Sequence, residues 1–384
     1  MPHTLSGEFE RLRLQVRHFV QEELEPISLA VETQGQIPEP IVDRMRQMGL
    51  FGMPIPKAYG GLGLTTLQEV MIYEEITQTN GCYRSRIGTS NGIGSMGIVY
   101  DGTEAQKEFY LPRIACGEWS SAFALTEPNA GSDASNIATT AVLDGDHWVL
   151  NGNKIFITNA DQAQLFTTIA VTDEEKRARG GVTAFIVERG MPGFSIGAAD
   201  VKMGLKGSHT NELIFKDCRV PAENVIGGMP MVGQGFKTAM RVLDKGRLCM
   251  AACALGAAQK IMTLCIQRMR EKRQASTAGT SSQAAEFMLA DMATQIFAAR
   301  QMLYQAARLR DDGRQITSEA SMTKIFCTEM ASRVADHALQ IFGEEGLLTV
   351  HQIEILLRDV RLYRIYEGTS EIQRLIVSRG LLKS

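Results

Sequence analysis

The sequence lacks the signatures of most common catalytic and binding chemistries. Its six histidines show no metal-ligand spacing, and it contains neither a Gly-x-Ser-x-Gly nucleophile motif nor a phosphate-loop motif. The seven cysteines, an odd number, include no Cys-x-x-Cys pair, which indicates reduced thiols rather than a disulfide framework. A net charge of −3 gives no reason to expect nucleic acid or an anionic membrane as a partner. No metal is expected.

Signals for export and membrane insertion are also missing. Residues 1–10 contain no apolar core of a signal peptide, and no uninterrupted apolar run approaches membrane-spanning length. We therefore expect a soluble protein of a reducing compartment, cytoplasmic or, as an open alternative, in the mitochondrial matrix. A chain of 384 residues can bury a large core and is expected to form two or three packed units.

Two changes of periodicity divide the chain. Residues 5–117 show helical spacing, short alternating segments begin near residue 120, and helical spacing returns after residue 235. Such blocks of helices, strands and helices favour separate packed units over a Rossmann sheet. We predict an α+β fold with an N-terminal helical domain at 1–118, a central β-barrel-like domain at 119–228 and a C-terminal four-helix bundle at 229–384.

The strands and long helices can be given approximate bounds. Asp144-Gly-Asp and Asn151-Gly-Asn have the composition of hairpin turns. Strands are expected at 139–143, 148–151, 154–158, 165–171, 182–187 and 212–215. Four long amphipathic helices, typical of a bundle, are expected at 236–272, 283–312, 316–342 and 352–382.

The last of these helical segments is interrupted around one carboxylate, Glu367. Gly368 is a natural helix stop, and Ser370 with Gln373 fits a capping box that starts another helix. Glu367 is therefore expected in a joint between two helices, near the positive end of the second. A carboxylate held in such a joint is a candidate general base, although a solvated surface glutamate is the commoner alternative.

A family resemblance carried by several motifs supports the first interpretation. Residues 365–374, Ile-Tyr-Glu-Gly-Thr-Ser-Glu-Ile-Gln-Arg, resemble the C-terminal signature of the acyl-CoA dehydrogenase family. That resemblance implies that Glu367 abstracts the α-proton of a CoA thioester. A minority branch of the family carries its catalytic glutamate at the position of Gly246, so the glycine leaves Glu367 as the matching base.

Two further stretches are similar to the flavin-binding segments of that family. Residues 123–133, Phe-Ala-Leu-Thr-Glu-Pro-Asn-Ala-Gly-Ser-Asp, give a strand and a turn of small residues whose backbone can approach a ring or phosphate closely. Residues 150–159 match the second segment, with Phe156 beside the flavin ring and Thr158 as donor to flavin N5. From the residues alone, a tight turn and an ordinary hairpin stay open.

Matches elsewhere complete the set of implied contacts. Residues 202–208 and 215–227 resemble the end of the family's β domain, and residues 243–247 resemble the segment whose arginine lies near CoA. The resemblance implies FAD contacts from Phe123, Leu125, Thr126, Ser132, Phe156, Thr158, Lys272, Arg273, Gln340, Gly343, Thr369 and Glu371. It implies acyl-CoA contacts from Ser132, Leu243, Asp244, Arg247 and Gly368.

The sequence departs from the family pattern at two places that concern the ADP half of FAD. Residues 272–278 lack the usual phenylalanine, which is replaced by Ala275, and Lys272 or Arg273 stands for the usual arginine. In residues 340–346, Glu344 occupies the position of a glycine that lies close to the pyrophosphate. Because a carboxylate near a diphosphate is repelled, we expect weaker FAD retention or an altered path for the adenylate.

One stretch bears on the substrate. Residues 82–86, Cys-Tyr-Arg-Ser-Arg, resemble the segment of glutaryl-CoA dehydrogenases in which an arginine binds the distal carboxylate of the acyl chain. Arg84 and Ser85 match, but Thr77 stands where those enzymes carry an acidic residue. Surface arginines after a helix remain the alternative.

Together these motifs predict an FAD-dependent enzyme that converts an acyl-CoA to a trans-2-enoyl-CoA. In this chemistry Glu367 takes the α-proton and the β-hydrogen leaves as hydride to flavin N5. The resemblance implies a homotetramer, a dimer of dimers, with an electron-transfer flavoprotein as acceptor. Three alternatives stay open: a dicarboxylyl-CoA substrate, an acyl group on a carrier protein, and a degenerate, flavin-poor protein that binds acyl-CoA without turnover.

Overall fold

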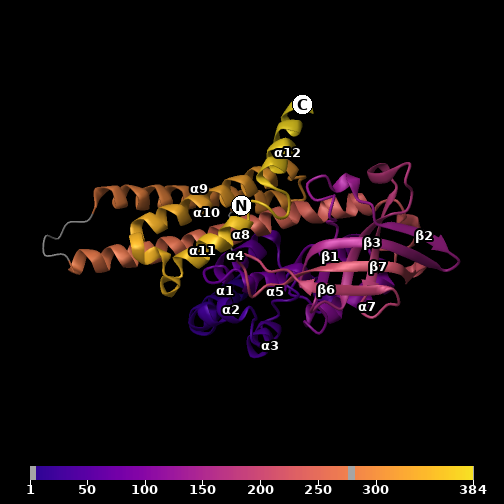
Figure 1. Ribbon diagram of the computed structural model, residues 1–384, viewed down its shortest axis with the longest axis horizontal. Coiled ribbons are helices and arrows are strands. Elements are labelled where there is room, and N and C mark those ends of the chain that lie inside the picture. Colours follow the sequence, from indigo (N-terminus) through magenta and orange to yellow (C-terminus); the bar gives the residue numbers. More distant parts are fainter. Residues whose placement is uncertain (1–5, 276–281, 384) are drawn as a thin grey trace.

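The structure is a computed structural model that describes residues 6–275 and 282–383. It has three parts: a set of short N-terminal helices, a curled sheet at one end, and long C-terminal helices that extend to the other end (Figure 1). The predicted α+β architecture, with strands between two helical regions, is confirmed.

The N-terminal part consists of short helices with well-defined starts. Thr65 and Thr103 each form a capping box with the glutamine three residues on, which satisfies the free N–H groups of the first turn. α4 is buried on almost all sides because α1, α8 and α9 cover it, and the equally buried α5 packs against α4 and β1. The helices are α1 Gly7–Phe19, α2 Ser28–Gln34, α3 Glu39–Gln47, α4 Thr66–Ile76, α5 Cys82–Asn91, α6 Met96–Asp101 and α7 Glu104–Ala115.

The central part is one seven-stranded curled sheet. Its strand order is β1-β4-β2-β3-β7-β6, with β5 paired to β4. The β1–β4 pair is parallel, whereas β2–β3, β3–β7, β4–β5 and β6–β7 are antiparallel. The strands are β1 Ser121–Ala124, β2 Thr140–Asp144, β3 His147–Thr158, β4 Leu165–Val171, β5 Val182–Glu188, β6 Phe194–Ala199 and β7 Thr210–Pro221.

The hairpin predicted at Asn151-Gly-Asn is wrong. β3 runs without a turn through this point, and β7 pairs with both halves of it. Gly152 takes a φ of 147° and the register with β7 shifts beside it, so the glycine marks a β-bulge. The Asn-Gly signal is local, and the long partner strand overrides it. The sequence also gave no signal for β6.

The C-terminal part is a bundle in which α10 packs against α8, α9, α11 and α12. The last predicted helix, 352–382, is two helices separated by the residues around Glu367, so the break predicted there is present. α12 projects from the bundle at the end nearer the sheet (Figure 1). The helices are α8 Gly235–Ala275, α9 Gln283–Asp311, α10 Thr317–Phe342, α11 Ile353–Leu362 and α12 Ser370–Lys383.

α8 is the central helix of the molecule. It is long and apolar enough to cross a membrane by length and composition, but 67% of its most apolar window is buried inside the protein. A largely buried helix that contacts α4, α9, α10 and two strands is a core helix.

Candidate active site

Glu367 lies in the joint between α11 and α12 in a left-handed conformation, with a φ of 53°. The residue as a whole is half-buried, yet its Oε2 atom is buried and has no hydrogen-bond partner among the described residues. A side chain at position 246 would collide with this carboxylate, because a Cβ on Gly246 would lie 2.0 Å from Oε2. The glycine on α8 therefore makes room for the Glu367 side chain.

Three cations surround this carboxylate. Burial raises the pKa of the Glu367 carboxyl, and the three positive charges oppose that rise without cancelling it. They are Arg84 on α5, Arg247 on α8 and Lys324 on α10. The joint therefore holds a carboxylate that is a stronger base than an exposed one but can still ionise.

The joint is capped differently from the prediction. The N-cap is Thr369, whose Oγ1 accepts from Ile372 N at 3.3 Å, and Ser370 Oγ is buried without a partner. Gln373 reaches back as expected of its position, since its Nε2 donates to the carbonyls of Glu367 (3.2 Å) and Gly368 (3.1 Å). Glu371 is exposed in the first turn of α12. The prediction of a capping box at Ser370 is thus off by one residue.

Lys324 is a functional candidate that the sequence reasoning missed. Its Nζ donates to the carbonyls of Tyr366 (3.2 Å) and Gly368 (2.7 Å), the residues on either side of Glu367. Lys324 shares a face of α10 with the buried residues Ala320, Cys327 and Ala331. A lysine at helical spacing within an apolar stripe was the available signal.

Arg84 is buried rather than on the surface. Only 8% of it is exposed, and its guanidinium lies 4.9 Å from the centre of the Tyr73 ring. Gly88, one turn further along α5, leaves space for it, because a Cβ there would lie 2.9 Å from Arg84 Cζ. Within residues 6–275 and 282–383, no carboxylate lies within ion-pair distance of Arg84.

The two stretches that resemble flavin-binding segments lie against each other. Ile155 N donates to Thr126 O at 2.9 Å, and the buried Lys154 donates from Nζ to Leu125 O (3.1 Å) and to Glu127 Oε1 (2.7 Å). Burial lowers the pKa of Lys154 to about 8 against the opposing effect of Glu127. The backbone at Leu125 and Thr126 is thereby fixed from behind.

The side chains of these two stretches range from buried to exposed. Phe156 has a left-handed φ of 58° and is 62% exposed, an unusual state for a large aromatic on a strand. Thr158, two residues further on, and Thr126 in the other stretch are half-buried, whereas Phe123 and Leu125 are buried and Ser132 is exposed in its turn. An exposed ring flanked by hydroxyls and fixed backbone suits a planar, polar-edged cofactor.

α8 runs from the two stretches that resemble flavin-binding segments to the Glu367 carboxylate. Leu243 packs against the cluster that contains Phe123 and Leu125. Gly246, next to the Glu367 carboxylate, follows three residues later, about 5 Å along the helix axis. Arg247 is buried and hydrogen-bonds to Asp244, which also accepts from Thr317 Oγ1 at 2.8 Å. One turn of α8, residues 243–247, thus carries the predicted substrate contacts. The same turn contacts the Glu367 carboxylate and the cluster that contains Phe123 and Leu125.

Four of the predicted FAD contacts, Lys272, Arg273, Gln340 and Gly343, lie apart from the others, in a region that we call the bundle tip and that consists of residues 268–273 and 340–346. This is the end of the bundle away from the sheet (Figure 1). Lys272 Nζ donates to the carbonyls of Ile341 (3.1 Å) and Phe342 (3.4 Å), and Arg268 pairs with Glu345. The side chains of Arg273, Gln340 and Glu344 are exposed, and Gly343 has a φ of 68°. The side chain of Ala275 and residues 276–278 lie outside the described residues.

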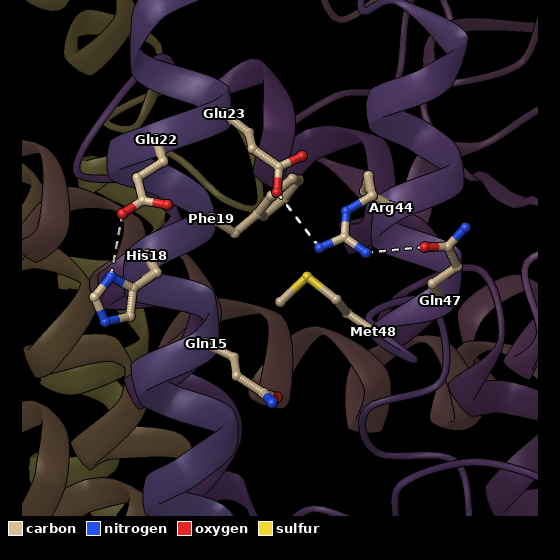
Figure 2. Close-up of a pocket in the computed structure, with 8 residues that line it drawn as sticks. All are labelled: Gln15, His18, Phe19, Glu22, Glu23, Arg44, Gln47 and Met48. Atoms are coloured by element: carbon tan, nitrogen blue, oxygen red, sulfur yellow. Dashed lines mark hydrogen bonds and ion pairs between the residues drawn. The ribbon is translucent and has the colours of Figure 1, made fainter.

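A surface hollow of about 420 Å³ lies away from Glu367, between α1 with the turn after it and α3 (Figure 2). Glu23 pairs with Arg44 at 3.4 Å across it, and His18 pairs with Glu22 at 3.6 Å. Its mixed, exposed charges hold no arrangement of nucleophile, base or metal ligands.

Known proteins resemble this chain over its whole length. Family models describe residues 6–118, 122–218 and 233–382 as the N-terminal, middle and C-terminal domains of acyl-CoA dehydrogenase. The CarC subunit of the caffeyl-CoA reductase–Etf complex of Acetobacterium woodii is 39% identical over 379 residues, with 98% of this chain and 99% of the relative covered.

Solved structures agree with this result. Butyryl-CoA dehydrogenase from Megasphaera elsdenii is 35% identical, with a TM-score of 0.94 and full coverage of both chains. A glutaryl-CoA dehydrogenase in complex with glutaryl-CoA is 31% identical, with a TM-score of 0.92 and coverage of 100% of this chain and 97% of that one. The chain belongs to the acyl-CoA dehydrogenase family and is an oxidoreductase of that family.

Proposed function

We propose that the protein is an FAD-dependent dehydrogenase that removes two hydrogens from an acyl-CoA and yields a trans-2-enoyl-CoA, with Glu367 as the base. One observation carries this proposal: the buried Oε2 of Glu367, which has no partner in the part of the chain that the structure describes, lies beside Gly246. Leu243, one turn of α8 away, packs against the cluster that contains Phe123 and Leu125. Bound FAD would accept the β-hydrogen as hydride.

The residues of the joint account for proton removal. The α-proton of a thioester is weakly acidic, so a base and a donor to the thioester oxygen are both needed. Among the described residues, no acceptor is found for the backbone N–H of Glu367, while the carbonyls at 366–368 are taken by Lys324 and Gln373. The N–H is thus available to the thioester oxygen, and the carboxylate to the α-proton.

The pH dependence follows from burial. Because burial raises the pKa of Glu367, the fraction in the basic, ionised form grows as pH rises through that pKa. The rate of proton abstraction should therefore fall on the acid side and level off above the raised pKa.

We propose a dicarboxylyl-CoA as the second candidate substrate, and the position of Arg84 favours it. A buried guanidinium that lacks a carboxylate partner in the described chain is a binding site for an anion supplied from outside. Glu367 lowers the electrostatic cost of this cation only in part, because its own carboxylate must face the α-carbon. The distal carboxylate of a short dicarboxylyl chain would complete the pairing.

We further propose an electron-transfer flavoprotein as acceptor and a homotetramer, a dimer of dimers, as the assembly. The similarity to a subunit of a reductase–Etf complex supports the first. Exposed apolar side chains beside the bundle tip support the second, since Leu347, Leu348 and Val350 are 71%, 54% and 67% exposed in the single chain.

Anaerobic titration of the purified protein with butyryl-CoA and with glutaryl-CoA tests these proposals. Bleaching of the flavin by either ester supports the dehydrogenase, and preferential bleaching by glutaryl-CoA supports the dicarboxylyl substrate. A colourless protein that still binds CoA esters would instead support the degenerate, flavin-poor alternative. Bleaching only by a carrier-bound acyl group would move the substrate to that class.

A further inference from the structure

Lys324 is buried in α10 and points at the joint that carries Glu367. None of its side chain is exposed. Its Nζ bridges Tyr366 O at 3.2 Å and Gly368 O at 2.7 Å, so the carbonyls on both sides of Glu367 share one donor. Glu367, the residue between them, has the left-handed φ of 53°. A strained residue persists where its surroundings over-determine it, and Lys324 supplies two of those restraints.

Burial of the Lys324 ammonium group costs free energy, although the fold itself does not require a charge at this position. Among residues 6–275 and 282–383, no carboxylate lies within ion-pair distance of Nζ. Burial lowers the pKa of Lys324 to about 8, with Glu367 as the largest opposing charge. An apolar side chain of similar length would remove that cost, but it would leave Tyr366 O without its donor and Gly368 O with the Gln373 bond alone.

Other charges near Lys324 are engaged elsewhere. Glu329, one turn along α10, pairs with Arg364 at 3.0 Å and Arg374 at 3.6 Å. Arg247 on α8 adds a second positive charge, and Glu371 on α12 a negative one that is exposed. Glu367 itself faces Arg84 from α5, Arg247 from α8 and Lys324 from α10. Of these three cations, Lys324 alone also holds the backbone of the joint.

We propose that Lys324 is a positioning residue for Glu367. Its two hydrogen bonds hold the peptide planes that aim the carboxylate at Gly246 and the N–H of Glu367 at the substrate, and its charge favours the ionised base. This inference rests on the proposed role of Glu367. It predicts two separable effects, one from the hydrogen bonds and one from the charge.

Three variants separate these effects. Lys324→Met keeps the length but loses both donors and the charge, Lys324→Gln keeps an N–H donor without charge, and Lys324→Arg keeps both. The titration of Glu367 is followed by infrared difference spectroscopy of its protonated carboxyl, with Glu367→Gln as the reference that lacks the band. This readout needs no turnover, so it stands even if no acyl-CoA proves to be a substrate.

Loss of a nearby positive charge raises the pKa of a carboxyl, so the midpoint should move to higher pH. We expect a shift of roughly one unit in Lys324→Met and Lys324→Gln and the wild-type midpoint in Lys324→Arg. The limiting rate of flavin reduction should fall about 100-fold in Lys324→Met, less in Lys324→Gln, with KM little changed.

A wild-type midpoint and rate in folded, flavin-bound Lys324→Met would overturn the proposal. If Lys324→Met fails to fold, the contrast between Lys324→Gln and Lys324→Arg decides the question, because a purely structural role would leave the midpoint alike in both. If the midpoint shifts but the wild-type flavin is reduced by no acyl-CoA, the positioning role stands and the proposed function fails.

Discussion

The joint at Glu367 and the bundle tip both match family motifs, yet they use their charges in opposite ways. At the joint, cations from α5, α8 and α10 converge on one carboxylate whose Oε2 stays free. At the tip, Lys272 donates to the carbonyls at the end of α10 and Arg268 pairs with Glu345. The Glu344 carboxylate there is exposed. A motif match therefore shows where a site lies, but only the partners of its cations show whether those cations are available to a ligand.

The largest expected effect is at the joint. Glu367→Gln keeps the shape of the side chain and removes the base, so flavin reduction by an acyl-CoA should slow on the order of 10⁴-fold. Ligand binding and flavin content should persist, because the backbone of the joint is held by Lys324 and Gln373. Anaerobic stopped-flow absorbance measures the rate. Reduction at a near wild-type rate would mean that Glu367 is not the base, and the joint would then not differ from the bundle tip in this respect.

The space beside the carboxylate gives the next effect. Gly246→Ala places a Cβ where Oε2 lies, 2.0 Å away, so the carboxylate must move and the rate should fall roughly 100-fold. Gly256→Ala is not a suitable control, since a Cβ there would also collide, at 2.2 Å from Thr77 Oγ1. Gly7→Ala, at the start of α1, where a Cβ would meet only Arg11 Nη1 at 3.9 Å, is the matched control and should leave the rate unchanged. Equal rates in both variants would mean that Glu367 works in another position.

Substitution of Arg84 tests whether the joint binds the distal carboxylate of a substrate, which would distinguish it further from the tip. Arg84→Met should raise KM for glutaryl-CoA by roughly 10- to 100-fold, as loss of a charge-assisted hydrogen bond would, and change KM for butyryl-CoA far less. Steady-state kinetics with both esters measures the ratio. An equal change for both esters would assign Arg84 to the packing of α5 alone.

The smallest effect is expected at the tip. Glu344→Gly removes an exposed carboxylate where a glycine would suit a diphosphate, and we expect FAD affinity to rise by a factor of about 3 to 10, within the range of exposed charge interactions. Glu174→Gln, which removes an exposed carboxylate in the loop between β4 and β5, is the control for loss of a negative charge. Reconstitution of the apoprotein followed by flavin fluorescence measures the affinity.

Stoichiometric flavin in wild-type protein after gel filtration, with no gain in Glu344→Gly, would contradict this prediction. It would show that Glu344 does not hinder FAD binding and that the tip suits its ligand as well as the joint does.

The order of helices and strands and the break at Glu367 were predictable because they depend on local signals. Apolar periodicity defines the blocks, and Gly368 takes a positive φ of 89° directly before the cap of α12, although α11 already ends at Leu362. The cap was assigned to Ser370 instead of Thr369 because both hydroxyl residues fit the spacing, and only the fold decides which one accepts from the backbone.

Features that depend on distant partners were missed. Lys324 is 43 positions before Glu367, and the sequence does not show that α10 lies under the joint. Arg84 looked like a surface residue because the burial of α5 by α4 and β1 is a tertiary effect. The Asn151-Gly152 turn failed for the same reason, since pairing with β7 carries β3 straight through it.

Solvent exchange at the α-carbon tests the central claim most directly. In deuterium oxide without an electron acceptor, the wild-type protein should incorporate deuterium at Cα of a bound acyl-CoA, and mass spectrometry of the recovered ester should show it. Incorporation should be lost in Glu367→Gln and should fall in wild type as pH drops below the raised pKa of the carboxyl. Equal incorporation in both proteins would mean that another group removes the proton.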